Sequence, residues 1–529
     1  MPPVTEEGNT IIEEMAVEVA PPTQSSSASI THRQIRGSSL LLVGRFIALG
    51  LNFAVQVLIV RYLTQSAYGA FAYALSLVAL CQPLVTLGLD RGVGRFLAVY
   101  DEHRDHARVI GTLALILGTV LSLGLALVLV VIGVQSLTGG SLIGDAHASI
   151  LLTILIVLAP IQAADDLLSG VLAVFASARA IFFRKYLLGP GLRLVVVGLL
   201  IVGGFDAPFL AIGYVLAGVA GLVLYGAILW RVLEARGILA GIHWQDIRVP
   251  AREILAFTMP LLTTDLVYVA LNTTDAIFLG HFWGTNEVAA YRVIQPLVGI
   301  NTVVYSSFTL LYMPAASRLF ARGDRDGVAN LYWRTAIWMA VFSFPIFALT
   351  TSLAGPITVG IYEERYANSA VYLALLSFAS YVNVALGFNG LTLRVFGFIR
   401  YTVVINVVAA LISLTLNLLL IPRYGAIGAA VSTSLALILF NLLKQAGLRR
   451  GTGISVFDRR YLWVYVTIGL AAAALAVVDS LLHPGLILSV ILAGVASLGV
   501  LWATRRALDV GNTFPEILRL PFARRILGG

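Results

Sequence analysis

A small set of charged side chains inside long apolar runs gives this sequence its candidate chemistry. A charge at the centre of a membrane helix costs about 2.5–3.5 kcal/mol on insertion scales, so such residues mark functional sites by default. The arginines of this set are Arg45, Arg193 and Arg292. Arginine stays charged, and its planar guanidinium donates paired hydrogen bonds that suit a phosphate or pyrophosphate group. We therefore predict that these arginines bind an anionic substrate group.

Aspartates occupy similar apolar positions and suit a different task. A buried carboxylate can exchange a proton or hold a cation between two states of a protein. Asp265 and Asn272 are seven residues apart, and Asn272 and Asp275 are three apart, so these side chains share one helical face. The residues predicted to serve ion coupling or gating are Asp265, Asn272, Asp275, Asp165 and Asp166.

Structural roles are open for the same residues. Arg45 or Arg193 could form a salt bridge with Asp165 or Asp166 instead of binding substrate. The polar stripe of Asp265 and its neighbours could serve hydrogen bonding between helices. Asp275 and Arg292 are expected at comparable depth near one face of the membrane, where they could pair as an outer gate.

Composition places these residues in a membrane protein. The chain has 529 residues, of which 59% are hydrophobic and 12% charged, with a mean hydropathy of +0.92. Soluble domains carry about 25% charged residues. The apolar runs are continuous, unlike the alternating strands of a membrane β-barrel. The sequence therefore predicts an all-α polytopic membrane protein.

The remaining composition excludes several classes of site. The single cysteine, Cys81, excludes an internal disulfide and a thiolate metal cluster, and we expect no metal site. The basic residues are dispersed among loops, which argues against nucleic-acid binding. No phosphate-cradling GxxxxGK[ST] motif is present. We expect no cofactor other than a coupling H⁺ or Na⁺.

About fourteen apolar runs are long enough to span a bilayer, which takes about 20 residues each. The predicted spans are 40–62, 69–89, 109–134, 150–175, 186–204, 208–229, 254–280, 287–313, 331–354, 370–393, 401–421, 426–443, 461–481 and 484–504.

The distribution of basic residues orients these spans. With the N-terminus placed in the cytoplasm, 28 of the 35 Lys and Arg residues fall on the inner side and three (Arg61, Arg365 and Arg423) on the outer side. Inner loops are enriched in Lys and Arg in membrane proteins. We therefore expect a multi-pass protein of the plasma (inner) membrane with both termini in the cytoplasm.

An internal repeat divides the chain. Residues 66–80 match 286–300 at an offset of 220, and 184–213 match 399–428 at an offset of 215. The predicted units are a disordered tail (1–37), a six-helix bundle (38–230), an interfacial linker (231–253), a second six-helix bundle (254–447), an added helix pair (448–504) and an amphipathic tail (505–529). Each bundle has six spans, an even number, so both bundles enter the membrane from the same side and the repeats are parallel. Two such bundles around a central cavity predict a transporter that works by alternating access.

Four segments resemble the polysaccharide (O-antigen-type) flippases of the multidrug/oligosaccharidyl-lipid/polysaccharide exporter superfamily. They are "RYLTQSAYGAFAYALSLVALCQPLVTLGLDRGVGRFLA", "TMPLLTTDLVYVALNTTDAIFLGHFWGTNEVAAY", "IYEERYANSAVYLALL" and "NLLLIPRYGAIGAAVSTSLALIL". The resemblance covers nearly the whole chain after Ser38. A count of fourteen spans is similar to the polysaccharide and lipid II flippase branches, whereas the multidrug branch usually has twelve.

The resemblance implies a transporter, not an enzyme, that moves a lipid-linked oligosaccharide from the inner to the outer leaflet. Arg45 and Arg193 would then contact the lipid phosphate from the cytoplasmic side. Membrane lipids, and glycosyltransferases or a polymerase of the same pathway, are the expected partners. The alternatives are a cation-coupled multidrug exporter, a lipid II flippase and, from another class, an integral-membrane glycosyltransferase or polymerase.

Overall fold

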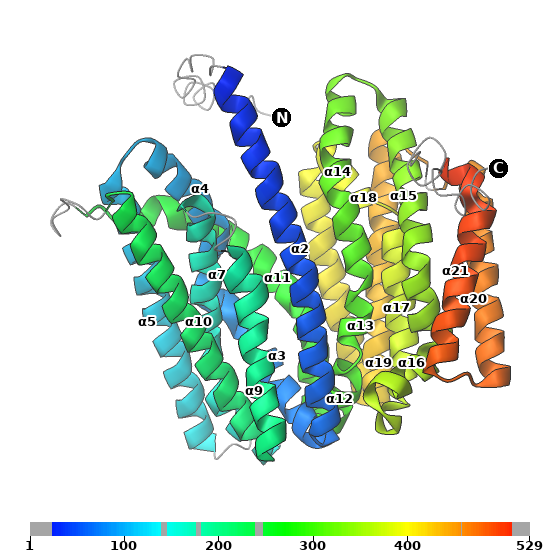
Figure 1. Cartoon of the computed structure of the whole chain (residues 1–529), viewed down its shortest axis with the longest axis horizontal. Helices are drawn as coiled ribbons and strands as arrows, with labels where there is room; N and C mark the ends of the chain where they lie inside the picture. The colour runs from blue at the N-terminus through cyan, green and yellow to red at the C-terminus, as the bar shows by residue number, and fades with distance from the viewer. Residues whose placement is uncertain (1–23, 139–144, 176–180, 239–246, 456, 510–529) are drawn as a thin grey trace.

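A computed structural model of the chain describes residues 24–138, 145–175, 181–238, 247–455 and 457–509. Every regular element in these ranges is a helix, and long helices run side by side in two groups (Figure 1). The predicted all-α fold class is therefore confirmed.

The N-terminal half contains α2 to α10. Its helices are α2 (Gln24–Tyr62), α3 (Gln65–Thr86), α4 (Leu89–Glu102), α5 (His106–Thr138), α6 (Ala146–Leu155), α7 (Leu158–Phe175), the π-helix η1 (Phe182–Leu188), α9 (Gly189–Gly203) and α10 (Ala207–Ala235).

The C-terminal half begins with the long helix α11. Its helices are α11 (Ala251–Trp283), α12 (Thr285–Arg292), α13 (Gln295–Gly299), α14 (Asn301–Ala321), α15 (Arg325–Phe347), η3 (Ala348–Ser352), α16 (Ala354–Tyr362), η4 (Glu364–Tyr366), α17 (Ser369–Ala385), α18 (Asn389–Val395), α19 (Ile399–Thr452), η5 (Arg459–Tyr461), α20 (Leu462–Leu482) and α21 (Leu486–Leu508).

The number of spans agrees with the prediction once two irregular helices are taken into account. Within the described ranges, 12 helices are long and apolar enough to cross a membrane, and a pair bent by 41° within 285–321 adds a thirteenth. The 54 residues of α19 would extend about 81 Å as one helix, more than twice the ~30 Å hydrocarbon core. Gly425 breaks α19 with φ 58° and ψ −137°, a left-handed region open to glycine, so α19 supplies two spans and the total is fourteen.

The first helix is longer than predicted. Residues 24–37 were expected to be disordered, but α2 begins at Gln24 and continues into the first span. A helix propagates from an existing turn far more readily than it nucleates, so the membrane span can extend into the polar segment before it. Residues 1–23 lie outside the described ranges.

The two halves meet where the sequence repeat begins. The first residues of α3 and α12, Gln65 and Thr285, are 220 positions apart, which is the offset of the repeat. A Cβ on Gly69 would lie 1.8 Å from the Thr285 carbonyl oxygen and 3.3 Å from the Cβ of Ala289, the repeat equivalent of Gly69. Glycine therefore allows the two repeats to touch at equivalent positions.

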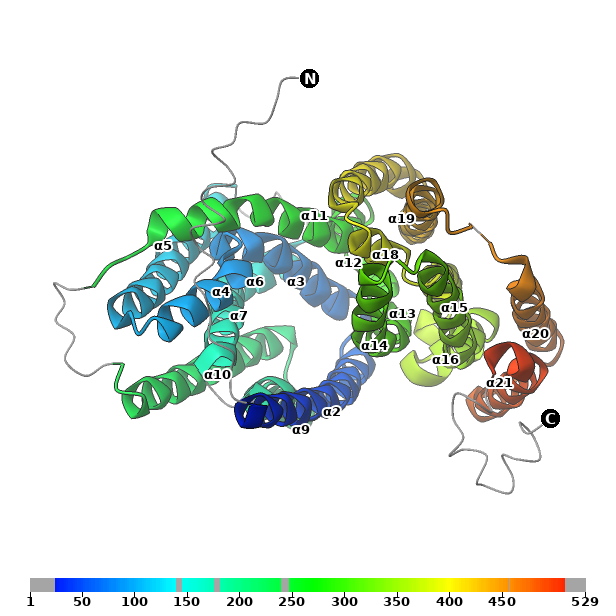
Figure 2. The same ribbon diagram turned by 90° about the horizontal axis from the view of Figure 1, so that it is seen from above.

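Helix α11 joins the two halves (Figure 2). Its first turns lie against α4, where the Arg95 guanidinium lies 5.0 Å from the Phe257 ring and the Tyr100 hydroxyl donates to Glu253 (3.1 Å). Its last turns pack against α3 and α19. The added pair, α20 and α21, packs on α15 at the far side of the C-terminal half.

Candidate functional site

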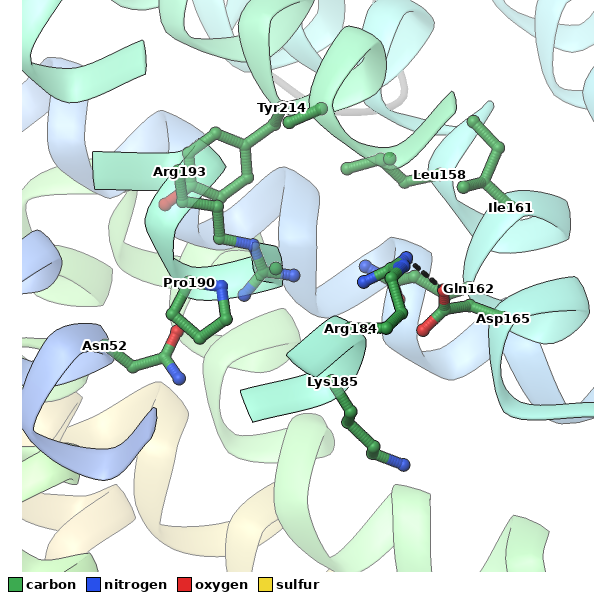
Figure 3. Close-up of a pocket in the computed structure, with 13 residues that line it drawn as sticks. Asn52, Leu158, Ile161, Gln162, Asp165, Arg184, Lys185, Pro190, Arg193 and Tyr214 are labelled. Carbon is green, nitrogen blue, oxygen red and sulfur yellow. Dashed lines mark hydrogen bonds and ion pairs between the residues drawn. The ribbon is translucent and has the colours of Figure 1, made fainter. Parts of the chain in front are cut away.

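A cavity of about 210 Å³ lies within the N-terminal half, between α2, α7, η1, α9 and α10. Its polar and charged lining is shown in Figure 3: Asn52, Gln162, Asp165, Arg184, Lys185, Arg193 and Tyr214. Three cations and one carboxylate line this space, so it carries an excess of positive charge. Such a cavity favours an anion.

A π-helical turn brings two of these cations into the cavity. Pro190 has no N–H and cannot bond to the carbonyl four residues earlier, so the preceding turn widens. The Gly189 N–H instead donates to the Arg184 carbonyl, five residues earlier. Arg184 and Lys185 lie on this widened turn, η1, and π-helical turns are frequent at functional sites.

Arg184 is held rigidly. Its side chain is 7% exposed, and its Nη2 donates to the Asp165 carboxylate (Figure 3). Its Nε donates to the Gly221 carbonyl (3.0 Å), and its guanidinium lies over the Tyr225 ring at 4.6 Å. With its charge compensated and three contacts fixing its geometry, Arg184 shapes the cavity wall rather than offering a free charge.

Arg193 is the free guanidinium of the cavity. It lies ten residues before the end of α9, which is about 15 Å along the helix and near the middle of a bilayer. Its guanidinium lies 5.4 Å from the Tyr214 ring, and no carboxylate of the described residues pairs with it. Lys185 is partly compensated by Asp166 at 3.6 Å, and Asp166 also accepts from Gln82 (2.9 Å).

Of the two arginines predicted to act together, Arg45 and Arg193, only Arg193 lies in the cavity. Arg193 lines the cavity, whereas Arg45 is exposed on α2 and is not among the lining residues. Arg45 lies seven residues before Asn52, so it shares the helical face of that cavity residue about 10 Å away along the axis. The salt bridges that Asp165 and Asp166 form are to Arg184 and Lys185, not to Arg45 or Arg193.

The polar side chains on one face of α11 contact different partners. Asp265 accepts a hydrogen bond from Arg91 on α4 (2.5 Å), and its other oxygen is buried without a partner. Asn272 and the Thr273 and Thr274 side chains donate to carbonyls four residues earlier in the same helix. The expected hydrogen bonding between helices is therefore absent from these three side chains.

Asp275 faces Arg292, as the sequence suggested. The Asp275 carboxylate lies 4.0 Å from the Arg292 Nη2, and Asp275 is 5% exposed. The same Nη2 donates to the Asn272 carbonyl (3.1 Å), and the Arg292 Nε is buried without a partner. Arg292 is therefore placed beside the α11 carboxylate and outside the N-terminal cavity; a gating role for the pair stays a prediction.

Two arginines form hydrogen bonds between the two halves where α2 ends. Arg61 donates to the Gly360 and Ile361 carbonyls (both 2.8 Å). Arg365 donates to the Val60 (2.7 Å), Arg61 (2.9 Å) and Leu63 (2.9 Å) carbonyls. The last carbonyls of a helix lack partners within it and attract cations, so each arginine caps a helix of the opposite half. We call Arg61 and Arg365 the arginine latch.

Other polar contacts lie at the same end of the molecule. The Thr285 hydroxyl donates to Asp145 (2.9 Å), and the Gln65 amide donates to the Asn286 carbonyl (3.2 Å). Among the described residues, every hydrogen bond between segments 24–235 and 285–508 lies at this latch end. The two halves are therefore closed together at the latch end.

The sequence-based prediction missed five of these residues for identifiable reasons. Arg91, Arg184 and Lys185 were assigned to loops because the apolar runs end before them, although the helices continue. Arg61 and Arg365 were counted only as exceptions to the positive-inside pattern. Basic residues are rare on the outer side, so an arginine at such a position indicates a specific structural or functional role.

Comparison with known proteins places this geometry among transporters. The chain is 22% identical over 425 residues to the uncharacterized membrane protein MJ1068 of Methanocaldococcus jannaschii, covering 77% of this chain and 82% of that protein. It is also 22% identical over 207 residues to the probable multidrug resistance protein NorM of Mannheimia succiniciproducens, covering 36% of this chain and 43% of that protein.

Two solved structures share the fold. One is the lipid II flippase MurJ in an inward closed conformation, with a TM-score of 0.66 and 14% identity, covering 88% of this chain and 99% of MurJ. The other is an inward-facing multidrug resistance MATE family transporter of the MOP superfamily, with a TM-score of 0.60 and 14% identity, covering 81% and 95%.

Two family descriptions match the sequence directly. Residues 260–419 match the family described as MatE. Residues 35–320, more than half of the chain, match the family described as polysaccharide biosynthesis protein. The predicted resemblance is confirmed: the chain belongs to the polysaccharide biosynthesis protein family, among the flippases and transporters of the multidrug/oligosaccharidyl-lipid/polysaccharide exporter superfamily.

Proposed function

We propose that this transporter flips a polyprenyl-(pyro)phosphate-linked oligosaccharide from the inner to the outer leaflet for the synthesis of a cell-surface polysaccharide. The observation that carries the proposal is Arg193, an uncompensated guanidinium near mid-membrane depth in a positively charged cavity. A phosphate group of the lipid carrier would accept paired hydrogen bonds from this guanidinium. The polyprenyl chain would stay in the surrounding lipid.

Alternating access would come from the arginine latch. The latch end has few basic residues, so by the positive-inside rule it faces outward and both termini lie in the cytoplasm. With the latch formed, the outer side is shut and the cavity would load from the inner leaflet. Arg45, nearer the cytoplasmic end of α2, would meet the phosphate before Arg193 does. Release would require the latch to break.

The paired carboxylates would supply ion coupling. Asp265 and Asp275 each face an arginine, and Asp165 and Asp166 each face a cation, with Asn272 beside Arg292. A proton or Na⁺ that replaces the cationic partner of a carboxylate would free that partner for the substrate or for a second conformation. Glycosyltransferases or a polymerase of the same pathway would supply and consume the transported glycan.

The test is flipping by purified protein in proteoliposomes. The probe is a polyprenyl-pyrophosphate-linked oligosaccharide with a fluorophore on the sugar, and flipping is the rise in the fraction that external dithionite bleaches. Because one charge-assisted hydrogen bond contributes about 1.5–3 kcal/mol, Arg193→Gln should slow flipping about 10- to 100-fold. Arg193→Lys keeps the positive charge but loses the paired N–H donors of the guanidinium, so this variant should be less impaired than Arg193→Gln.

Matched controls make this test specific. Arg231, on α10 and exposed, is not a cavity residue, so Arg231→Gln should flip at the wild-type rate. Equal rates for Arg193→Gln and wild type would contradict the proposed phosphate site. A rate no faster than that of protein-free liposomes would contradict the proposed function.

A multidrug exporter is the second candidate, because residues 260–419 match the MatE family. Most such drugs are cations, which the excess positive charge of the cavity would repel. Proteoliposomes with an imposed H⁺ or Na⁺ gradient should therefore fail to accumulate ethidium. Ethidium uptake at a rate unaffected by the lipid-linked oligosaccharide would favour the exporter.

A further inference from the structure

The cavity that holds Arg193 is too small for a whole oligosaccharide. Its volume of about 210 Å³ lies below the ~300–1,000 Å³ of pockets that enclose drug-sized ligands. With a phosphate bound to Arg193, the remaining space fits the part of the glycan next to that phosphate. The other lining residues are therefore placed to contact the first sugar, and their chemistry defines which sugar fits.

One wall of this cavity comes from a single face of α7. Its residues are spaced at i, i+3, i+4 and i+7, which places them on one side of the helix. Figure 3 shows Arg193 and Tyr214 across the cavity from this wall. A sugar whose phosphate lies at Arg193 would therefore meet the α7 wall. The α7 wall consists of Leu158, Ile161, Gln162 and Asp165.

Gln162 provides the free hydrogen-bonding capacity of the α7 wall. Asp165 is bound to Arg184, whereas the described residues form no hydrogen bond with the half-buried Gln162 amide. Asn52, the other neutral amide of the lining, already donates to the Ala48 carbonyl (2.7 Å). A glutamine that only joined helices would be bonded to a neighbouring helix, so the free Gln162 amide indicates a ligand.

The neighbours of Gln162 on the α7 wall are apolar. Leu158 and Ile161 are buried, and a Cβ on Gly218 of α10 would lie 3.0 Å from the Ile161 Cγ2 and 3.4 Å from the Leu158 Cδ2. A hydroxyl group placed against these side chains would lose its hydrogen bonds to water, whereas a methyl group would be favoured there. The α7 wall thus combines one free amide with an adjoining surface that suits a methyl group.

We propose that the α7 wall selects an acetamido sugar as the first sugar of the transported glycan. Gln162 is the specificity-determining residue, because its NH₂ can donate to the acetamido carbonyl. The methyl group bonded to that carbonyl carbon would then lie against Leu158 and Ile161. A sugar with a hydroxyl in place of the acetamido group is too short to make both contacts. The inference rests on the proposed function, since the phosphate at Arg193 places the sugar.

The test uses the flipping assay in proteoliposomes with two probes that differ in the first sugar. Each probe is a polyprenyl-pyrophosphate-linked trisaccharide with a fluorophore on the last sugar, and its first sugar is N-acetylglucosamine or glucose. At limiting probe concentration, wild-type protein should flip the N-acetylglucosamine probe about 20-fold faster, from one hydrogen bond and one buried methyl group. Gln162→Leu loses the amide, so it should reduce this ratio to about fourfold, the part that the methyl group supplies.

The ratio of the two rates separates selection of the sugar from damage to the fold. Arg193→Gln should slow both probes by the same factor, because both carry the phosphate. Gln295→Leu changes a half-buried glutamine of α13 outside the cavity and should leave both rates unchanged. A third probe with N-formylglucosamine as its first sugar lacks only the methyl group. Wild-type protein should flip it about fourfold more slowly than the N-acetylglucosamine probe.

Three results would count against the inference. Equal rates for the N-acetylglucosamine and glucose probes in wild-type protein would overturn it and leave the proposed function intact. A Gln162→Leu variant that slows both probes equally would show a structural glutamine and overturn it as well. Failure of the wild-type protein to flip either probe would contradict the proposed function and this inference together.

Discussion

Every candidate carboxylate in the spans has a cationic partner, and this pairing decides what each residue can do. The pairs are Asp165 with Arg184, Asp166 with Lys185, Asp265 with Arg91, and Asp275 with Arg292. Arg193 is outside this set, so its charge remains available to a ligand. The pairs differ in burial, and their contributions to stability should differ accordingly.

Asp165→Asn should destabilise the protein much more than Asp166→Asn. Asp165 pairs with Arg184, whose side chain is 7% exposed, and breaking a buried pair costs about 3–5 kcal/mol because a buried charge is left unpaired. Asp166 and Lys185 are 46% and 42% exposed, and exposed pairs contribute about 0–1 kcal/mol. Thermal unfolding in nanodiscs measures both. Equal losses of stability would show that Arg184 is not held by Asp165 alone.

The sequence identified Asp165, Asp166 and Arg193 because a charge stands out in an apolar run. It could not identify Arg184, because the predicted span began at residue 186 and placed Arg184 in water. Span ends are uncertain by about a helical turn from sequence. Arg184 and Lys185, two of the three cations that line the cavity, lie within that turn.

At the scale of elements, the π-helical turn η1 positions Arg184 and Lys185. The motif Gly189-Pro190-Gly191 directly follows η1 and begins α9. In the structure the helical path continues through it, and Pro190 widens the turn before it. A proline that removes one donor in an unbroken helix leaves no periodicity signal, which explains why the sequence alone did not predict the turn.

Pro190→Ala should impair the cavity without changing any charge. The restored N–H can bond to the carbonyl four residues earlier, which favours an α-helical turn and rotates the preceding residues by up to about 100°. Arg184 would then lose its alignment with Asp165, and flipping should fall at least tenfold. Pro314→Ala, in α14 and away from any π-helical turn, is the control. Normal flipping by Pro190→Ala would show that η1 does not depend on this proline.

At the scale of the whole molecule, the closed latch end follows the sequence repeat. Asp145 and Arg365 are 220 positions apart, which is the offset of the repeat, and each contacts the opposite half. Asp145 accepts a hydrogen bond from Thr285 of the second repeat, and Arg365 donates to the end of α2 beside Gln65. The sequence predicted the repeat and its offset. It did not predict the latch, because the acceptors are backbone carbonyls that no residue type reveals.

Arg61→Gln with Arg365→Gln should open the latch end. The two arginines donate five hydrogen bonds across the halves. At about 1 kcal/mol net each, the five hydrogen bonds together approach the ~5.5 kcal/mol that shifts a two-state conformational equilibrium from 1:99 to 99:1. Spin labels at Thr64 and Glu364 should show a longer distance in the double variant. Arg423→Gln, the third arginine expected on this side, should keep the wild-type distance.

Reversible locking of the latch end tests most directly whether movement of the halves carries the lipid-linked glycan. Gln65 and Asn286 lie in contact across the halves, and with Cys81 replaced by serine, cysteines at these two positions can be bridged by a bis-methanethiosulfonate reagent. We expect flipping of the lipid-linked oligosaccharide in proteoliposomes to stop on bridging and to recover when a reductant cleaves the bridge. An unchanged flipping rate in fully bridged protein would contradict alternating access.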